Sequence, residues 1–217
     1  MQVKSKARVA KHGEVFTNPR EVNAMLDLVA DQITRIDATF LEPACGSGNF
    51  LVEILRRRMA VLNQKYGKSP TEYPAKAVQA VCGLYGIELL PDNTAECRER
   101  LFATFTADYL PSMQSADDYP RVCNTVRHVL RKNIVCGNAL TYQTEHGLPI
   151  TFIQWQFIDR ARVKAKQFEL QATVETTGGR IGSQHDLFGD NGEPARIVQH
   201  KKEFPPVHYL EIGNEAA

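Results

Sequence analysis

The sequence predicts an α/β fold in which a parallel β-sheet is flanked by helices and followed by a β-rich C-terminal segment. Two observations predict it. Up to about residue 140, short apolar runs alternate with longer segments whose apolar residues recur at helical spacing. Beyond residue 140, apolar and polar side chains alternate singly, which is typical of half-exposed antiparallel strands.

The first elements follow from this spacing. Residues 19–33 place apolar side chains on one helical stripe, and residues 38–44 form a short apolar run that ends at a proline, as a buried strand would. Residues 48–67 again show helical spacing, and Gly67 ends this second helix. The arginines of the stretch LRRRM at residues 55–59 are expected on its solvent-exposed side.

The next elements repeat the alternation. Residues 80–89 are a second short apolar run, and residues 91–105 begin with a proline and an acid, which favours a helix N-terminus. Residues 119–133 predict a further helix, and residues 133–140 a third buried strand. Strands that alternate with helices in this way indicate a parallel sheet with helices on its faces.

The C-terminal part is expected to be a hairpin followed by a loop. Residues 150–159 and 162–174 predict its two strands, and residues 176–196 are rich in glycine. We therefore divide the chain into an α/β domain of residues 1–140 and an appendage of residues 141–217.

Composition excludes several classes of protein. Lysine and arginine total 26 against 25 acids, so the net charge of +1 gives no overall signature of nucleic-acid binding. The five cysteines contain no CxxC pair, which argues against a zinc site or a disulfide framework, and we expect no metal. The basic N-terminus has no apolar core of signal-peptide length, and no segment approaches a membrane span. We expect a cytoplasmic protein without a membrane partner.

Polar side chains stand at the ends of all three expected strands. Glu42 precedes the turn that contains Gly46 and Gly48, Glu88 ends the second strand, and Asn138 ends the third. In an open α/β sheet, ligands bind beyond the carboxyl ends of the strands, and glycine lets the backbone approach them closely. An acid on the second strand commonly holds the two hydroxyls of a ribose. The plain alternatives are a strand-to-helix turn for the glycines and helix capping for Glu88.

Four segments carry a resemblance to a known family. The chain resembles the S-adenosylmethionine-dependent DNA adenine-N6 methyltransferases of restriction–modification systems over residues 11–140, and more loosely beyond. The resemblance implies a Rossmann-like class I methyltransferase fold. The matching segments are HGEVFTNPREVNAMLDLV, FLEPACGSGNFLVEIL, YGIELLPDN and IVCGNAL.

The resemblance also implies S-adenosylmethionine as the cofactor and a set of residues that contact it. Phe16 and Thr17 would line the methionine end of the cofactor. A loop under the methionine and ribose would be formed by Glu42, Ala44, Cys45, Gly46 and Gly48.

The other cofactor residues lie on the second and third strands. Glu88 would bind the ribose hydroxyls, and Leu89 would lie beside the adenine ring. Asn138 stands where the family usually has an aspartate that accepts from the adenine amino group, and an amide can still accept there.

The catalytic motif of that family, (D/N)-P-P-(Y/F/W), is absent from the sequence. The only adjacent prolines are Pro205 and Pro206, preceded by Phe204 and followed by Val207, so we assign no catalytic residue. We expect a split or incomplete methyltransferase, in which a second polypeptide supplies the fourth strand and target recognition. DNA binding by this chain alone is expected to be weak or to depend on that partner.

Two other functions stay open at this stage. The chain could be a non-catalytic protein that binds S-adenosylmethionine, or a nicotinamide-dependent dehydrogenase, which we rank last because EPACGSG lacks the GxGxxG spacing. The appendage carries aromatic and basic residues that could contact DNA bases, although aromatic packing of a hairpin is the favoured interpretation. These residues are Tyr142, Trp155, Phe157, Arg160, Arg162, Lys164 and Lys166.

Overall fold

A parallel sheet lies at the centre of the computed structural model, which describes residues 8–10, 17–171 and 200–214. Its strands are β1 (Phe40–Glu42), β2 (Leu84–Glu88), β3 (Ile134–Asn138) and β4 (Gln143–Thr144), in the order β1-β2-β3-β4. The first three strands are parallel, as the alternation of strands and helices predicted, and β4 returns antiparallel to β3.

Helices precede and connect these strands. The helix of residues 19–27 begins with an Asn18–Glu21 capping box and a proline at its first position. The stripe of residues 19–33 breaks into two helices, and residues 80–82 belong to a helix rather than to the second strand. The helices are α2 (Pro19–Asp27), α3 (Ala30–Ile33), α4 (Asn49–Tyr66), α5 (Tyr73–Cys82), α6 (Pro91–Asp108), α7 (Pro111–Gln114) and α8 (Tyr119–Asn133).

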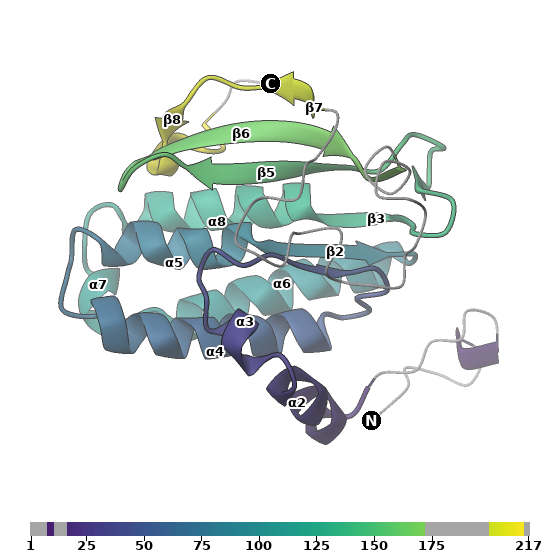
Figure 1. Cartoon of the computed structure of the whole chain (residues 1–217), viewed down its shortest axis with the longest axis horizontal. Helices are drawn as coiled ribbons and strands as arrows, with labels where there is room; N and C mark the ends of the chain where they lie inside the picture. The colour runs from purple at the N-terminus through teal and green to yellow at the C-terminus, as the bar shows by residue number, and fades with distance from the viewer. Residues whose placement is uncertain (1–7, 11–16, 172–199, 215–217) are drawn as a thin grey trace.

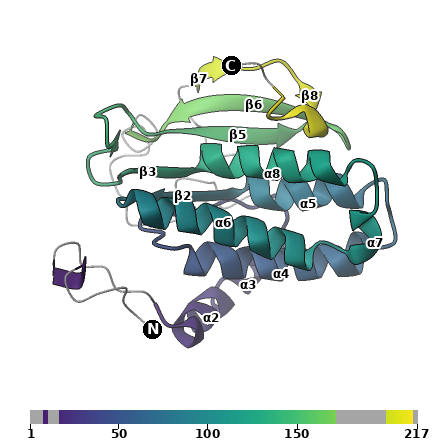
Figure 2. The same cartoon turned by 180° about the vertical axis from the view of Figure 1, so that it is seen from behind.

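A second, antiparallel sheet follows the first. It contains β5 (Thr151–Phe157), β6 (Arg162–Glu169), β7 (His200–Glu203) and β8 (Val207–His208), and a short 3-10 helix, Tyr209–Glu211, comes after it. The expected hairpin is confirmed as β5 and β6, whereas the glycine-rich stretch 176–196 lies outside the described residues. From top to bottom, Figure 1 passes from β6 and β5 through α8, β3 and β2 to α6 and α4, and Figure 2 shows the same layers from behind.

Side chains of β2 alternate between the two neighbouring layers, as the pleat of a strand requires. Leu84 belongs to the core cluster formed with the helices, whereas Tyr85 and Ile87 pack in a second cluster against the antiparallel sheet. The rings of Tyr85 and Phe152 lie 5.3 Å apart in an edge-to-face arrangement, and the Tyr85 hydroxyl donates to the carbonyl of Ile153 at 3.1 Å. The second sheet therefore covers one face of the parallel sheet. The domain boundary at residue 140 stays a prediction.

Trp155 attaches the second sheet to α8. Its indole Nε1 donates to Oδ1 of the buried Asn133 at 3.3 Å, and its ring meets that of His128 edge to face at 6.1 Å. Phe157, like Trp155, packs against the core cluster formed with the helices, and Tyr142 packs against the cluster that contains Tyr85 and Ile87. The aromatic residues of the appendage thus pack the hairpin, which confirms the favoured interpretation.

Arg58 departs from the expectation that its helix side faces solvent. Its side chain is fully buried. It donates to the carbonyls of Ile33 at the end of α3, Ala38 just before β1, and Ala80 near the end of α5. Burial lowers the pKa of Arg58 to about 10. Arg56, two residues earlier, keeps 57% of its side chain exposed. A helical stripe cannot distinguish these neighbours, because the carbonyl groups that Arg58 satisfies come from elsewhere in the chain.

Within the described residues, no helix combines the length and the apolar character needed to cross a membrane. The mixed α/β arrangement is compatible with a Rossmann-like fold.

Candidate functional site

Glu42, Glu88 and Asn138 lie on one face of the parallel sheet. In a parallel pair, residues in register point to the same side, and so do residues two positions apart on one strand. Glu42 is in register with Gly86, two residues before Glu88, and Glu88 is in register with Cys136, two residues before Asn138. The three polar side chains therefore form a staggered row at the carboxyl edge of the sheet, on the side of the helices. This edge is the candidate site.

Glu88 is buried, with 8% of its surface exposed, and holds the backbone around it. One carboxylate oxygen accepts from the amide of Gly46 at 2.9 Å. The other accepts from the amide of Leu90 at 3.0 Å and from the side chain of Asn93 at 3.4 Å. Glu88 thus links the strand end to the glycine turn and to the start of α6, and its oxygens retain unused acceptor capacity.

The glycine turn depends on the absence of side chains. Gly46 and Gly48 have φ of +53° and +88°, in the left-handed region that favours glycine. A Cβ on Gly48 would lie 2.6 Å from Sγ of Cys97, so the turn packs tightly against α6. No side chain caps the start of α4, which leaves its first backbone N–H groups available to a ligand.

The surroundings of Glu42 and Cys45 raise the pKa of both side chains. Burial raises the pKa of Glu42, although the amide of Ala44, at 3.4 Å, opposes the shift. A hydrogen bond to Cys97, together with burial and nearby carboxylates, raises the pKa of the Cys45 thiol. The thiol is therefore protonated near neutral pH and unsuited to act as a nucleophile.

Asn138 uses its side-chain oxygen within its own turn. Oδ1 accepts from the amide of Leu140 at 2.8 Å and from that of Thr141 at 3.4 Å. In this arrangement the side-chain amide presents its N–H donors to the surroundings. Leu89, whose expected place is beside an adenine ring, is 51% exposed, and Leu140 is 85% exposed. This end of the edge thus offers apolar surface next to an amide.

The N-terminal segment reaches the same turn through Thr17. The carbonyl of Thr17 accepts from Nδ2 of Asn49, the first residue of α4, at 3.1 Å. The structure therefore brings Thr17 next to the glycine turn, whereas Phe16 lies outside the described residues.

Arg100 is a residue of the site that sequence reasoning missed. Its Nη1 donates to the carbonyl and hydroxyl of Ser47 and to Oδ1 of Asn49, at 2.7, 2.9 and 2.8 Å. The signal that could have found it is the spacing on α6, where Asn93, Cys97 and Arg100 follow each other at positions i, i+4 and i+7 of one helix face. Asn93 and Arg100 are polar residues on this face, which indicates that the segment packed against α6 offers hydrogen-bonding groups.

Several basic residues on the described surface of the appendage lie next to acids that partly offset their charge. Lys164 and Lys166 both pair with Glu203, at 2.6 and 3.4 Å, and Arg162 pairs with Asp159 at 2.7 Å. Such pairing weakens the attraction of this surface for phosphate groups, consistent with the expectation of weak DNA binding.

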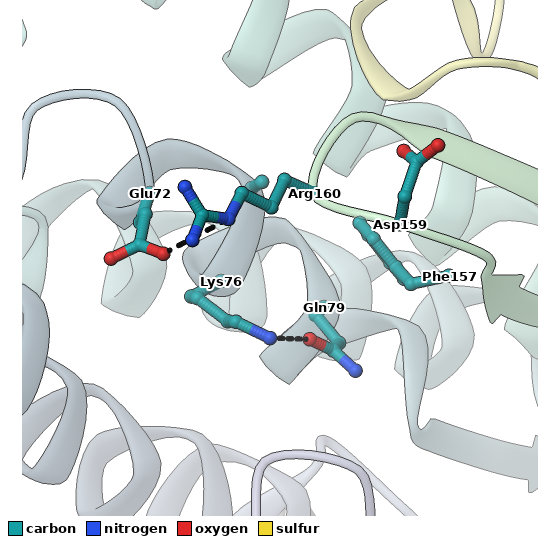
Figure 3. Close-up of a pocket in the computed structure, with 7 residues that line it drawn as sticks. Glu72, Lys76, Gln79, Phe157, Asp159 and Arg160 are labelled. Atoms are coloured by element: carbon teal, nitrogen blue, oxygen red, sulfur yellow. Dashed lines mark hydrogen bonds and ion pairs between the residues drawn. The ribbon is translucent and has the colours of Figure 1, made fainter.

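A small pocket lies away from the candidate site, between α5 and the turn that joins β5 to β6. Arg160 pairs there with Glu72 at 3.4 Å, and Lys76 donates to Gln79 at 3.0 Å (Figure 3). It has room for little more than a water molecule. Figure 1 shows α5 at the end of the molecule opposite to the arrowheads of β2 and β3. Among the described residues, no cluster of histidine, cysteine or acidic side chains could hold a metal ion.

The two adjacent prolines belong to the second sheet and not to the edge of the parallel sheet. Pro205 and Pro206 connect β7 to β8 in the second sheet, and the amide of Phe204 before them donates to the carbonyl of Ala165 at 2.9 Å. They therefore lie on a different sheet from Glu42, Glu88 and Asn138.

Comparison with known proteins identifies one family. A family model described as "MmeI, DNA-methyltransferase domain" matches residues 16–158, more than half of the chain. Searches of the curated proteins and of the solved structures found no match.

Proposed function

The chain belongs to the MmeI DNA-methyltransferase domain family of restriction–modification systems, and we propose that it binds S-adenosylmethionine at the carboxyl edge of its parallel sheet. The observation that carries this proposal is the row of Glu42, Glu88 and Asn138 on one face, beside a turn with two left-handed glycines. The family match includes these residues. A class I methyltransferase fold, with the donor site at this edge, accounts for all of these features.

The residues present fit this cofactor. Glu88 is buried at the strand end, and its free acceptor capacity suits the two hydroxyls of a ribose. The uncapped start of α4 suits the carboxylate of the methionine part, because backbone N–H groups and the helix dipole favour an anion there. Leu89 offers apolar surface for an adenine ring. The bound cofactor would supply an electrophilic methyl group, and the role of this chain is to hold and orient it.

The resemblance in sequence extends the proposal to adenine-N6 in DNA as the methyl acceptor. An exocyclic amine is a poor nucleophile, because its lone pair is delocalised into the ring. Enzymes overcome this by accepting hydrogen bonds from the amine and by stacking the flipped base on an aromatic ring. The 217 residues contain no tetrapeptide that provides both.

We propose that a second polypeptide supplies these groups through a further strand next to β1. Among the described residues, β1 pairs only with β2, so its other edge is open. In doubly wound sheets the strand order reverses beside the first strand, and ligands bind at that reversal. The open edge of β1 is therefore where a strand bearing the acceptor and the aromatic residue would complete both the sheet and the site.

Cofactor binding is tested by calorimetric titration with S-adenosylmethionine. Glu88→Ala should weaken binding by about 1–3 kcal/mol, the scale of hydrogen bonds to a charged group. Asp117→Ala, which removes an exposed acid from the loop between α7 and α8, should leave the affinity unchanged. Wild-type affinity in a folded Glu88→Ala variant would count against the assignment.

Catalysis is tested by incorporation of labelled methyl groups into unmethylated DNA. The 217-residue chain alone should give no turnover, and addition of a polypeptide that carries a (D/N)-P-P-(Y/F/W) motif should restore it. Robust turnover by the 217-residue chain alone would show that the acceptor has been missed. Cofactor binding without turnover in either mixture would favour a non-catalytic protein that binds S-adenosylmethionine.

A further inference from the structure

Arg100 contacts the glycine turn directly and reaches the segment of Thr17 through Asn49. A single guanidinium nitrogen contacts Ser47 in the glycine turn and Asn49 at the start of α4. Through its other side-chain atom, Asn49 donates to the carbonyl of Thr17 in the N-terminal segment. One side chain on α6 therefore fixes the turn, the helix start and the preceding segment relative to one another.

Two side chains of opposite charge bind the backbone of the glycine turn at consecutive residues, Gly46 and Ser47. Glu88 accepts from the amide of Gly46, and Arg100 donates to the carbonyl of Ser47. Charge-assisted hydrogen bonds of this kind are stronger than neutral ones. They act here on a turn that two glycines leave with many accessible conformations in the unfolded chain. Ser47 is 6% exposed, so its carbonyl and hydroxyl would lack a partner without Arg100 or an inserted water.

We propose that Arg100 is a positioning residue of the cofactor site, acting through Ser47 and Asn49. It keeps the turn in the one conformation in which the start of α4 and the backbone of Gly46 face the cofactor. This inference rests on the proposed function. It adds a determinant of cofactor affinity that lies on α6, beyond the segments that the sequence resemblance assigns to cofactor contacts.

The test compares Arg100→Ala with a matched control on the same helix. Arg98 is also half-buried and also donates to a backbone carbonyl, that of Ile134 at 3.0 Å, but it does not touch the turn. Arg100→Ala should raise the dissociation constant for S-adenosylmethionine by about 10- to 100-fold. Arg98→Ala should change it by less than about threefold, even if both variants lose similar thermal stability. Equal losses of affinity in the two variants would reduce Arg100 to a general support of the fold.

Arg100→Lys provides a rescue. An ammonium group carries three N–H donors, which can serve the three acceptors that one guanidinium nitrogen now serves. This variant should recover most of the affinity that Arg100→Ala loses. If Arg100→Ala does not fold, Asn49→Ala removes an acceptor from the opposite side and should weaken cofactor binding in the same direction. Wild-type affinity in Asn49→Ala would then overturn the inference.

Hydrogen exchange without cofactor separates this inference from the proposed function. Arg100→Ala should speed exchange of the amides in residues 45–52, and Arg98→Ala should not. If the wild type binds S-adenosylmethionine and a folded Arg100→Ala variant binds it equally well, the inference fails while the proposed function stands. If the wild type binds none, the proposed function fails and the role of Arg100 toward a cofactor fails with it. The exchange data still decide whether Arg100 fixes the turn.

Discussion

Gly48→Ala should be among the most damaging single-methyl additions in this chain. The residue has φ of +88°, and a left-handed conformation costs a residue with a Cβ about 1–2 kcal/mol. The new Cβ would also lie 2.6 Å from Sγ of Cys97, which is fully buried and cannot move into solvent. Overpacking of a tight core costs about 1–3 kcal/mol. Together the two effects predict a loss of about 2–5 kcal/mol in the free energy of unfolding.

A double-mutant cycle separates the two effects. Cys97→Ala removes Sγ, after which the nearest Cys97 atom to the new methyl is a Cβ at 3.5 Å, an ordinary contact. In that background, Gly48→Ala should cost only the backbone contribution, so the coupling should be about 1–3 kcal/mol. Gly147→Ala is the matched control, because Gly147 has φ of +72° but nothing within 4 Å of a Cβ.

Urea unfolding followed by circular dichroism measures all of these variants. If Gly48→Ala cost no more than Gly147→Ala, or if its cost were the same with and without Sγ of Cys97, the tight packing of the turn against α6 would be refuted. The interpretation that α6 holds the glycine turn of the cofactor site in one conformation would then fail as well.

Three further predictions concern charge. Burial raises the pKa of Glu42, so wild-type stability gains as pH falls through that raised pKa, and the gain is complete below the ordinary value of 4.5. Urea midpoints should therefore show Glu42→Gln as the more stable protein at pH 7, with an advantage that vanishes in acid. Arg58→Ala should lower the free energy of unfolding by about 3 kcal/mol or more, because three carbonyls lose a charged donor. Arg56→Ala, at an exposed position, should lower it by less than about 1 kcal/mol. Equal losses would contradict the burial of Arg58. By fluorescence anisotropy, the wild-type chain should bind duplex DNA weakly and without sequence preference, and Glu203→Gln should tighten that binding by freeing the lysines of β6. Nanomolar, sequence-specific binding by the wild type would overturn this.

The sequence predicted the parallel sheet and the place of its polar strand ends for a local reason. Each strand is a short apolar run that ends in a polar residue, and the carboxyl ends of parallel strands meet at one edge. The common face of Glu42, Glu88 and Asn138 depends on register, which no single segment contains. The end of helix α5 was assigned to a strand because its last three residues, Ala80–Cys82, are small and apolar and lead almost directly into the apolar residues of β2.

The contacts of Arg58 and Arg100 could not be predicted, because each satisfies carbonyl groups from distant segments. Glu88 shows a related limit. Helix capping and ribose binding were alternatives in the sequence, yet its carboxylate already accepts from the amide of Leu90 near the start of α6 while keeping acceptor capacity for a ligand. For Asn138, the sequence indicates an amide at the strand end. The hydrogen bond from Leu140 decides that its donors face outward.

The central claim is that the carboxyl edge of the parallel sheet holds S-adenosylmethionine. Hydrogen–deuterium exchange of the wild-type chain, with and without saturating cofactor, tests it most directly, because it reports where binding occurs as well as whether it occurs. Protection is expected in residues 40–49, 86–90 and 136–141, and none at the start of α5 or at the turn between β5 and β6. Unchanged exchange at the three strand ends, or protection confined to the α5 side, would contradict the claim.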